Sequence, residues 1–202
     1  MQKIIERVKA IVLKPRETWE TISGEETTII GLGKEYLLVL AAIPAVCSFL
    51  GKWIIGWRIP FRFGRVIRLS FGESLVVSIL WFVMTVAGVW LMGKVISFLA
   101  PKFGAEQDDV KGFKLSVYAY TPYFAAGILL IIPSLGILTT LAGLYGLYLL
   151  YIGLPIVMGT PKEKSLAYTI VVIIAMFLIY IIVGAITDAM LGAFGPSIYI
   201  SA

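Results

Sequence analysis

Residues 115–161 read LSVYAYTPYFAAGILLIIPSLGILTTLAGLYGLYLLYIGLPIVMGTP, a run of 47 residues without one charged side chain. A single helix of that length would extend about 70 Å, more than twice the roughly 30 Å thickness of the hydrocarbon core of a membrane. The run must therefore fold back on itself, and Pro133-Ser134-Leu135-Gly136 is the strong turn signal near its middle. The sequence predicts two membrane helices joined by a hairpin at this turn.

The composition of the whole chain also indicates a membrane protein. It is 59% hydrophobic and 14% charged, whereas an average soluble domain is roughly 25% charged. The chain has no His and a single cysteine, Cys47, so a disulfide framework or a thiolate metal cluster is excluded, and we expect no metal or cofactor. The formal charge of +5 comes from Lys and Arg residues that flank apolar segments. We therefore expect anionic lipid headgroups as partners, and not nucleic acid.

The pattern along the chain predicts an all-α, polytopic membrane protein, with one domain over residues 1–202 that forms a five-transmembrane-helix bundle. The spans are expected at about residues 30–55, 74–100, 113–132, 135–158 and 165–187. Pro44 lies within the first span, where neighbouring helices can compensate for the kink that a proline introduces.

Residues 1–28 precede the first span and form a basic N-terminal arm. Apolar side chains recur at helical spacing at Ile4, Ile5, Val8, Ile11 and Val12, with charged residues between them. This pattern favours an amphipathic helix at the membrane interface over a solvated arm. Pro15 suits the first turn of a second short helix, and Trp19 is expected to anchor that helix among the headgroups.

The distribution of Lys and Arg predicts the orientation. With five spans, twelve of these residues lie on the side of the N-terminus and five on the opposite side. Since basic residues accumulate in cytoplasmic loops, we expect a multi-pass protein with a cytoplasmic N-terminus and an external C-terminus.

The five basic residues on the external side include a cluster of arginines after the first span. Arg58, Arg62, Arg65 and Arg68 follow Trp57 at steps of four, three and three residues, which would place them on one helical face, although Pro60 argues against one regular helix. The cluster is a candidate contact for lipid phosphates or an acidic partner, because guanidinium groups bind phosphate in bidentate fashion. The alternative is an interfacial loop whose aromatic residues lie among the headgroups while its arginines point to water.

Small residues form a line along the fourth span. They are Gly136, Thr139, Gly143, Gly146 and Gly153, and we call this line the glycine seam. Membrane helices associate by close approach of their backbones, so the seam is expected to contact another helix. Tyr145, Tyr148 and Tyr151 project from roughly the opposite side. They line a polar cavity or fill the remaining interface.

Polar and aromatic residues gather near the start of the third span. The residues are Tyr118, Tyr120, Thr121 and Pro122, and with Tyr148 of the fourth span they form a candidate polar site within the membrane. Small transporters place their binding sites at such helix breaks. A kinked membrane helix without a binding site has the same pattern.

Catalytic chemistry has little support in the sequence. Every carboxylate lies in the arm, in a loop or at the end of a span, and no Ser-His or Cys-His pair is available to activate a nucleophile. No phosphate-binding loop or dinucleotide fingerprint is present. We expect a protein that is not an enzyme.

Several motifs together resemble a known family. They are the basic N-terminal helix with its Pro15–Trp19 continuation, LAAIPAVCSFLG at 40–51, YAYTP at 118–122 and YLLYIGLP at 148–155. In their order and spacing they resemble the Yip-domain superfamily of Ypt/Rab-interacting membrane proteins, in its bacterial YohC-like inner-membrane branch. The resemblance implies a five-span bundle with a cytoplasmic N-terminus. Eukaryotic relatives act with small GTPases in vesicle traffic, whereas the bacterial branch has no settled activity.

Two classes of function follow. The first is a non-enzymatic protein that organises lipid or protein partners, including a second copy of the chain, in the membrane. The second is a small transporter or channel with a site near the kinked third span and the tyrosines of the fourth. A water-filled cavity that reaches Tyr120 would favour the second class, and a solidly packed interior the first.

Overall fold

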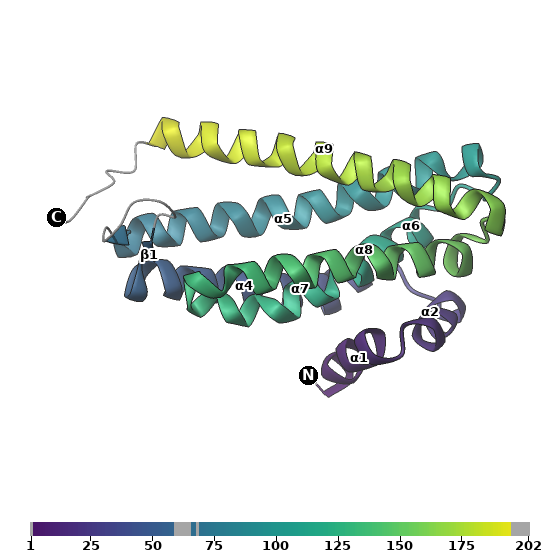
Figure 1. The fold of residues 1–202 in the computed structure, drawn as a ribbon, viewed down its shortest axis with the longest axis horizontal. Coiled ribbons are helices and arrows are strands. Elements are labelled where there is room, and N and C mark those ends of the chain that lie inside the picture. The colour runs from purple at the N-terminus through teal and green to yellow at the C-terminus, as the bar shows by residue number, and fades with distance from the viewer. Residues whose placement is uncertain (1, 59–65, 68, 195–202) are drawn as a thin grey trace.

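The computed structural model describes residues 2–58, 66–67 and 69–194, and these form a helical bundle (Figure 1). The predicted all-α membrane class is confirmed, and within the described part the strands are limited to the two-residue pair β1 and β2. The α-helices and strands are α1 (Gln2–Leu13), α2 (Pro15–Gly24), α3 (Ile29–Leu32), α4 (Leu38–Leu50), β1 (Trp57–Arg58), β2 (Val66–Ile67), α5 (Phe71–Leu99), α6 (Asp109–Ala119), α7 (Thr121–Ala126), α8 (Gly136–Met158) and α9 (Lys162–Phe194). The π-helical segments are η1 (Gly33–Leu37) and η2 (Gly51–Ile55), and the 3-10 segments are η3 (Ala100–Phe103), η4 (Gly127–Ile131) and η5 (Pro133–Leu135).

Four continuous helical segments of the described chain are long and apolar enough to cross a membrane. They cover Ile29–Ile55, Phe71–Phe103, Pro133–Met158 and Lys162–Thr187. The predicted third span, residues 113–132, is instead divided among α6, α7 and η4. The count of five spans is therefore not confirmed, and it stays a prediction.

The broken third segment is explained by its sequence and its surroundings. Pro122 has no N–H group and cannot donate the hydrogen bond of a continuous helix, so α6 ends at Ala119 and α7 begins at Thr121. In α6 every residue from Gly112 to Ala119 is buried. Thr121 and Pro122 at the break are buried as well, so the backbone at the break is shielded from lipid, where unpaired backbone groups would be costly.

Glycines allow three long helices to approach this central segment closely. A Cβ atom added to Gly146 of α8 would lie 2.4 Å from the carbonyl oxygen of Ala119, and one added to Gly112 would lie 2.4 Å from the carbonyl oxygen of Gly93 in α5. Pro44 of α4 packs on Gly127, where an added Cβ would lie 2.6 Å from the Pro44 Cβ. Each distance is too short for a side chain, so these contacts depend on glycine.

The ends of α5 and α6 are defined by local hydrogen bonds. Ser70 and Glu73 form a capping box at the start of α5, in which each side chain accepts a hydrogen bond from the other residue's backbone N–H, at 3.2 and 2.8 Å. Asp108 caps α6, and its carboxylate accepts hydrogen bonds from the backbone N–H groups of Val110 and Lys111 at 2.8 and 2.9 Å. Asp109, the first residue of α6, forms an ion pair with Lys94 of α5. The hydrogen bond from Lys94 lowers the pKa of the Asp109 carboxyl below its ordinary value.

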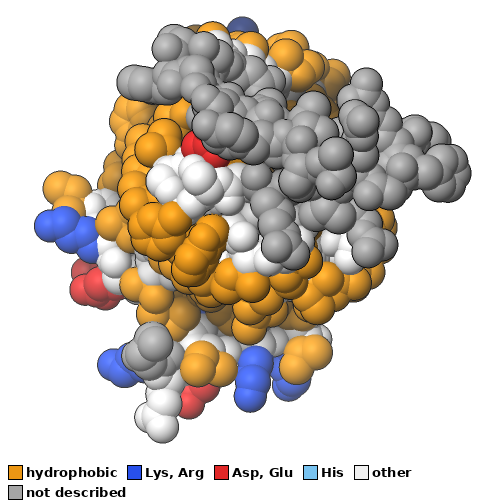
Figure 2. Space-filling view, turned by 90° about the vertical axis from the view of Figure 1, so that its left-hand side faces the viewer, with side chains coloured by type: hydrophobic (Ala, Val, Ile, Leu, Met, Phe, Trp, Pro, Cys, Tyr) orange, Lys and Arg blue, Asp and Glu red, His pale blue; other side chains and the backbone are white. Residues whose placement is uncertain are grey.

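The helix α9 lies at the outside of the bundle and exposes apolar side chains along its length. Leu166 is 59% exposed, Ile174 54% and Ile181 62%. Figure 2 shows hydrophobic side chains over much of the described surface on one end face, with charged groups at the lower margin, where α1 lies, and at the left. Exposure of so much apolar surface fits a bundle surrounded by lipid.

The expected position of Trp19 among the headgroups is wrong. Trp19 is fully buried between α2 and the bundle, with its ring 6.1 Å from that of Tyr118, centroid to centroid, in an edge-on arrangement. Gly153 of α8 makes room for it, since a Cβ at that position would lie 2.7 Å from the indole. The physical reason is that α2 docks on α8, which converts the predicted surface anchor into a core residue.

Candidate functional site

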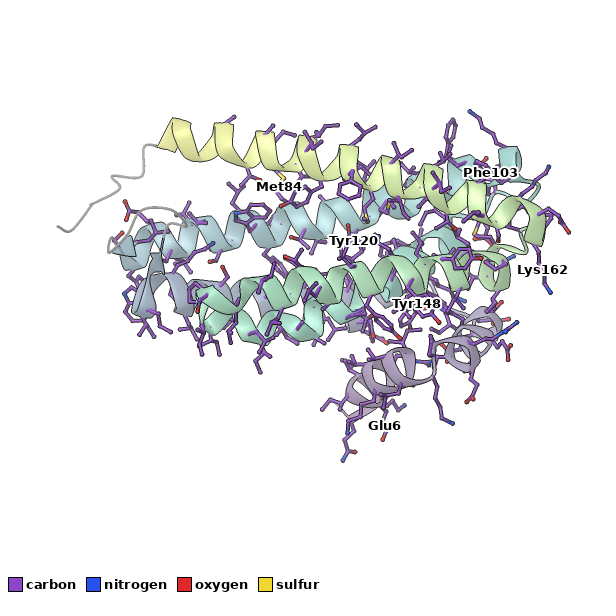
Figure 3. The ribbon with its side chains drawn as sticks, in the orientation of Figure 1. Glu6, Met84, Phe103, Tyr120, Tyr148 and Lys162 are labelled. Atoms are coloured by element: carbon purple, nitrogen blue, oxygen red, sulfur yellow. The ribbon has the colours of Figure 1, made fainter. Side chains whose placement is uncertain are left out.

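A groove of about 630 Å³ lies between the α1–α2 junction, α8 and the start of α9. The arm contributes Leu13, Lys14, Pro15, Arg16 and Glu17, α8 contributes Tyr148, Tyr151, Ile152, Pro155 and Ile156, and α9 contributes Lys162 and Ser165. Figure 3 shows Tyr148 on the side of α8 that faces the arm, and Lys162 at the end of the bundle where α9 begins. We call this site the basic groove.

The sequence at the α1–α2 junction places two cations at the basic groove. Pro15 is in the first turn of α2, so the chain bends between the two helices at Lys14. The bend leaves Lys14 and Arg16 exposed, whereas Ile11 and Trp19 on either side of the junction are fully buried. The buried side chains fix the arm, and the exposed ones face the groove.

Hydrogen bonds across sequence-distant elements hold the arm against the bundle. The Tyr145 hydroxyl donates to the carbonyl of Val12 at 2.8 Å, and the Ser23 hydroxyl donates to the carbonyl of Ile156 at 3.3 Å. Arg7 of α1 forms an ion pair with Glu25, which follows α2. The wall of the groove formed by the arm is thereby positioned relative to α8.

The lining of the basic groove combines positive charge, phenol groups and apolar surface. Lys14, Arg16 and Lys162 supply three cations, and Glu17 supplies one carboxylate, which lies 3.3 Å from the Lys14 ammonium. The lining therefore carries a positive surplus beside the hydroxyls of Tyr148 and Tyr151. Cations and hydroxyl donors next to apolar side chains match a phosphate headgroup and the hydrocarbon attached to it.

The structure divides the predicted polar site of Tyr118, Tyr120, Thr121, Pro122 and Tyr148 among four places. Tyr118 and Thr121 face the first span: the Thr121 hydroxyl lies 3.1 Å from that of Tyr36, and the Tyr118 ring lies 4.8 Å from the Tyr36 ring. Tyr120 lines a cavity on the opposite side of α8 from Tyr148 (Figure 3). Pro122 is buried in the first turn of α7.

The residues of the glycine seam have different neighbours. Added Cβ atoms on Gly146 and Gly153 would clash with Ala119 and with Leu115 and Trp19, respectively. Added Cβ atoms on Gly136 and Gly143 would make ordinary contacts of 3.8 Å with Leu130 and Tyr123. Thr139 is buried, and its hydroxyl donates to the carbonyl of Gly136 at 2.6 Å.

The predicted arginine cluster falls largely outside the described residues. Arg62, Arg65 and Arg68 are not described, and for Trp57 and Arg58 the structure gives the backbone. In the described ends of the segment, Trp57 pairs with Ile67 and Arg58 with Val66 as antiparallel strands. These extended ends agree with the argument from Pro60 against one regular helix across the segment.

The cations of the basic groove were not among the predicted site residues. Lys14 and Arg16 read as part of the amphipathic arm, and Lys162 as part of a loop between spans. The available signal was the Pro15 break beside two basic residues. The placement of residues 14–16 and residue 162 around one groove arises from tertiary docking and has no counterpart in local sequence.

The amino-acid sequence is similar to those of known membrane proteins. The sequence matches the Yip1 domain family over residues 9–184. It is 30% identical over 158 residues to the inner membrane protein YohC of Escherichia coli strain K12, and the alignment covers 77% of this chain and 80% of that protein. The YohC protein of the O6:H1 strain of Escherichia coli matches with the same identity and coverage. No solved structure matches.

Proposed function

Because the chain belongs to the Yip1 domain family, we propose that it is a non-enzymatic inner-membrane protein that binds anionic phospholipid at the basic groove and thereby organises lipid or protein partners at the cytoplasmic face. The family and the inner-membrane relatives support the location. The specific activity rests on the groove.

The observation that carries the proposal is the arrangement of Lys14, Arg16 and Lys162 around one groove beside the apolar side chains of α8. A basic residue near an anionic membrane surface contributes about 1 kcal/mol of attraction, so the surplus of two positive charges left after Glu17 favours an anionic headgroup by about 2 kcal/mol. Exposed lysines at the membrane surface also keep their ammonium groups in water while their aliphatic stems cover apolar surface.

The cytoplasmic orientation is part of the proposal. The helix α2 of the arm, the connection between α5 and α6, and the start of α9 lie toward the same end of the bundle in Figure 1. The helix α1 extends from α2 toward the middle, and the end of α9 lies at the other end. The whole arm, the connection and the start of α9 carry eight Lys and Arg residues, and Lys34, Lys94, Lys111 and Lys114 in the adjoining helices bring the number to twelve of the seventeen. An excess of basic residues marks the cytoplasmic side, where the inner leaflet also supplies anionic lipid.

The fixed arm supports a binding role over a catalytic one. Buried Ile11, Trp19 and Ile22 lock the arm, so the groove is a preformed surface. Because a preformed site loses little conformational entropy when a ligand binds, the fixed arm favours recognition of a lipid or a protein partner. The lining cations match headgroup binding without requiring a chemical step.

The test is a titration of the purified full-length protein in uncharged detergent with phosphatidylglycerol. At a ligand concentration of 100 times Kd, specific binding stabilises the folded state by about 2.7 kcal/mol, which appears as a rise in Tm. The triple variant Lys14→Gln, Arg16→Gln and Lys162→Gln is expected to lose this rise. A matched variant, Lys3→Gln, Lys9→Gln and Lys102→Gln, removes three exposed cations from outside the groove and is expected to keep it. Equal responses of the two variants, or an equal response of the parent to phosphatidylcholine, would contradict the proposal.

A further inference from the structure

A second cavity, of about 440 Å³, lies between α5, the α6–α7 break, α8 and α9. Tyr120 enters it from the break, and in Figure 3 this residue lies between α5 and α8. The surfaces of α5 and α9 that face the cavity include Met84 and Met176. The cavity is separate from the basic groove, since no residue lines both.

The position of the cavity along the helices places it within hydrocarbon. Its lining residues come from 81–92 of α5, from 139–150 of α8 and from 176–183 of α9. These are central parts of helices that are long enough to cross a membrane. An occupant at this depth is surrounded by the hydrocarbon core and reaches neither headgroup region.

The lining excludes a charged occupant. None of the residues that line the cavity carries a charge, and most of them are apolar. A charge placed there would lose its hydration without gaining a partner, at a large cost in free energy. The same chemistry disfavours a path for a hydrated solute past Tyr120.

Three tyrosines line the cavity: Tyr120 and Tyr123 at the helix break, and Tyr180 of α9, which is 64% exposed. Tyr120 and Tyr123 both line it, with ring centroids 6.5 Å apart in an edge-on arrangement. Among the residues that the structure describes, neither hydroxyl has a hydrogen-bond partner, whereas the Ser116 hydroxyl donates to the carbonyl of Val89 at 2.9 Å. An O–H donor in apolar surroundings is costly without an acceptor.

The helix break explains why these donors face the cavity. Pro122 ends the regular helix, so Tyr120 lies at the junction and Tyr123 follows three residues later, on the same face of the new helix. The open space beside them is bounded by Gly143, whose missing side chain leaves Tyr123 as the nearest group, at 3.8 Å from an ideal Cβ.

We propose that this cavity binds an uncharged lipid whose carbonyl oxygens accept hydrogen bonds from Tyr120 and Tyr123, with the hydrocarbon of the lipid lying between α8 and α9. Carbonyl oxygens at this depth occur on two kinds of uncharged lipid, the esters of diacylglycerol and the ring of a quinone. Both offer acceptors without a charge, and the experiment distinguishes them.

The experiment uses the full-length protein in lipid nanodiscs and three photoreactive probes. The probes are a diacylglycerol and a phosphatidylglycerol that carry the same diazirine-labelled acyl chain, and an azido-quinone. Peptides labelled after illumination are identified by mass spectrometry. The expected result is labelling of peptides from α7 and α8 by the diacylglycerol or the quinone, and the probe that labels them identifies the lipid class.

Two variants and one control test the site. Gly143→Phe fills the cavity, and its Cβ meets no backbone atom within 4 Å. Gly184→Phe is the control: Gly184 lies on α9, does not line the cavity, and an added Cβ there has no neighbour within 4 Å. The double variant Tyr120→Phe and Tyr123→Phe keeps the packing volume and removes both donors. We expect labelling to fall about tenfold in Gly143→Phe and in the tyrosine variant, and to be unchanged in Gly184→Phe.

The contradicting results are specific. Equal labelling by phosphatidylglycerol would mean that any acyl chain enters, which overturns the role of the phenol donors. Parental labelling in the tyrosine variant would overturn it as well. Labelling of α7 and α8 by neither uncharged probe would overturn the proposal as a whole.

Discussion

The ammonium group of Lys114 donates a hydrogen bond to the main-chain carbonyl of Ile22 at 2.9 Å and a second to that of Glu25. These carbonyls lie at the end of α2, where the last carbonyls of a helix lack their usual partners, and the Ile22 carbonyl also accepts from the Glu25 N–H at 3.3 Å. Lys114 is 5% exposed and belongs to α6, so a residue of the central segment caps a helix of the arm. The capped helix carries Arg16 and forms one wall of the basic groove.

Replacing Lys114 with Met is expected to loosen the arm. The change keeps the length of the side chain but removes the Lys114 donor from both carbonyls, and the Ile22 carbonyl keeps only the 3.3 Å hydrogen bond from the Glu25 N–H. A buried carbonyl left without a donor costs about 1–3 kcal/mol. Amide hydrogen exchange in α2 should accelerate while exchange in α5 and α8 stays close to the parent value. Lys111→Met on the same helix is the control, because the Lys111 side chain is 40% exposed and forms its ion pair with Asp108 within α6 and its cap. Unchanged exchange in α2 of the Lys114 variant would show that the cap does not hold the arm.

Gly146→Ala is expected to destabilise the bundle in detergent. The added Cβ would lie 2.4 Å from the Ala119 carbonyl oxygen, so α8 must move away from the central segment, and overpacking of this kind costs about 1–3 kcal/mol. Gly143→Ala is the matched control on the same helix, because its Cβ would make an ordinary 3.8 Å contact with Tyr123. Thermal unfolding of both variants measures the difference, and a Tm for Gly146→Ala at or above that of Gly143→Ala would contradict the packing.

Much of the fold could be predicted because membrane hydropathy is a local property. The uncharged run, the Pro133 turn and the charges that flank each span are visible in the sequence, and the all-α membrane class follows from them. The central position of the segment around Tyr120 was less visible, since a buried central helix and a lipid-facing helix are both apolar. Its environment, with Gly93, Pro44 and Gly146 on three neighbouring helices, is a property of packing.

The candidate site could be predicted only in part. The kink at Pro122 and the cluster of tyrosines around it could be identified in the sequence. The sequence does not show which side of a neighbouring helix each ring reaches. Tyr120 and Tyr148 lie on opposite sides of α8, so they belong to different cavities. The surface position expected for Trp19 failed for a similar reason, because docking of α2 on Gly153 is a long-range contact.

The orientation of the chain is tested by reporter fusions. A reporter that is active only outside the cytoplasm, fused after Ala202, is expected to be active, because five passes from a cytoplasmic N-terminus place that end outside. The same reporter inserted at Gln107, in the basic connection before α6, is expected to be inactive. The reverse pattern would overturn the orientation, and activity at neither position would overturn the odd number of passes.

The arginine cluster after the first span makes a separate lipid prediction. Replacing Arg58, Arg62, Arg65 and Arg68 with Gln is expected to reduce the anionic lipid that remains bound after purification, since each basic residue contributes about 1 kcal/mol of attraction near the membrane surface. Phosphate analysis of the purified protein measures the retained lipid. Retention equal to that of the parent would leave these arginines as a solvated rim.

The binding of anionic lipid at the basic groove is tested most directly by native mass spectrometry of the full-length protein purified with phosphatidylglycerol. If the basic groove binds the lipid, we expect the parent and the Lys3→Gln, Lys9→Gln and Lys102→Gln variant to carry the same number of bound phosphatidylglycerol molecules. The Lys14→Gln, Arg16→Gln and Lys162→Gln variant is predicted to carry fewer, because its groove has lost all three cations. Equal numbers of bound phosphatidylglycerol molecules in all three proteins would contradict the binding of anionic lipid at the basic groove.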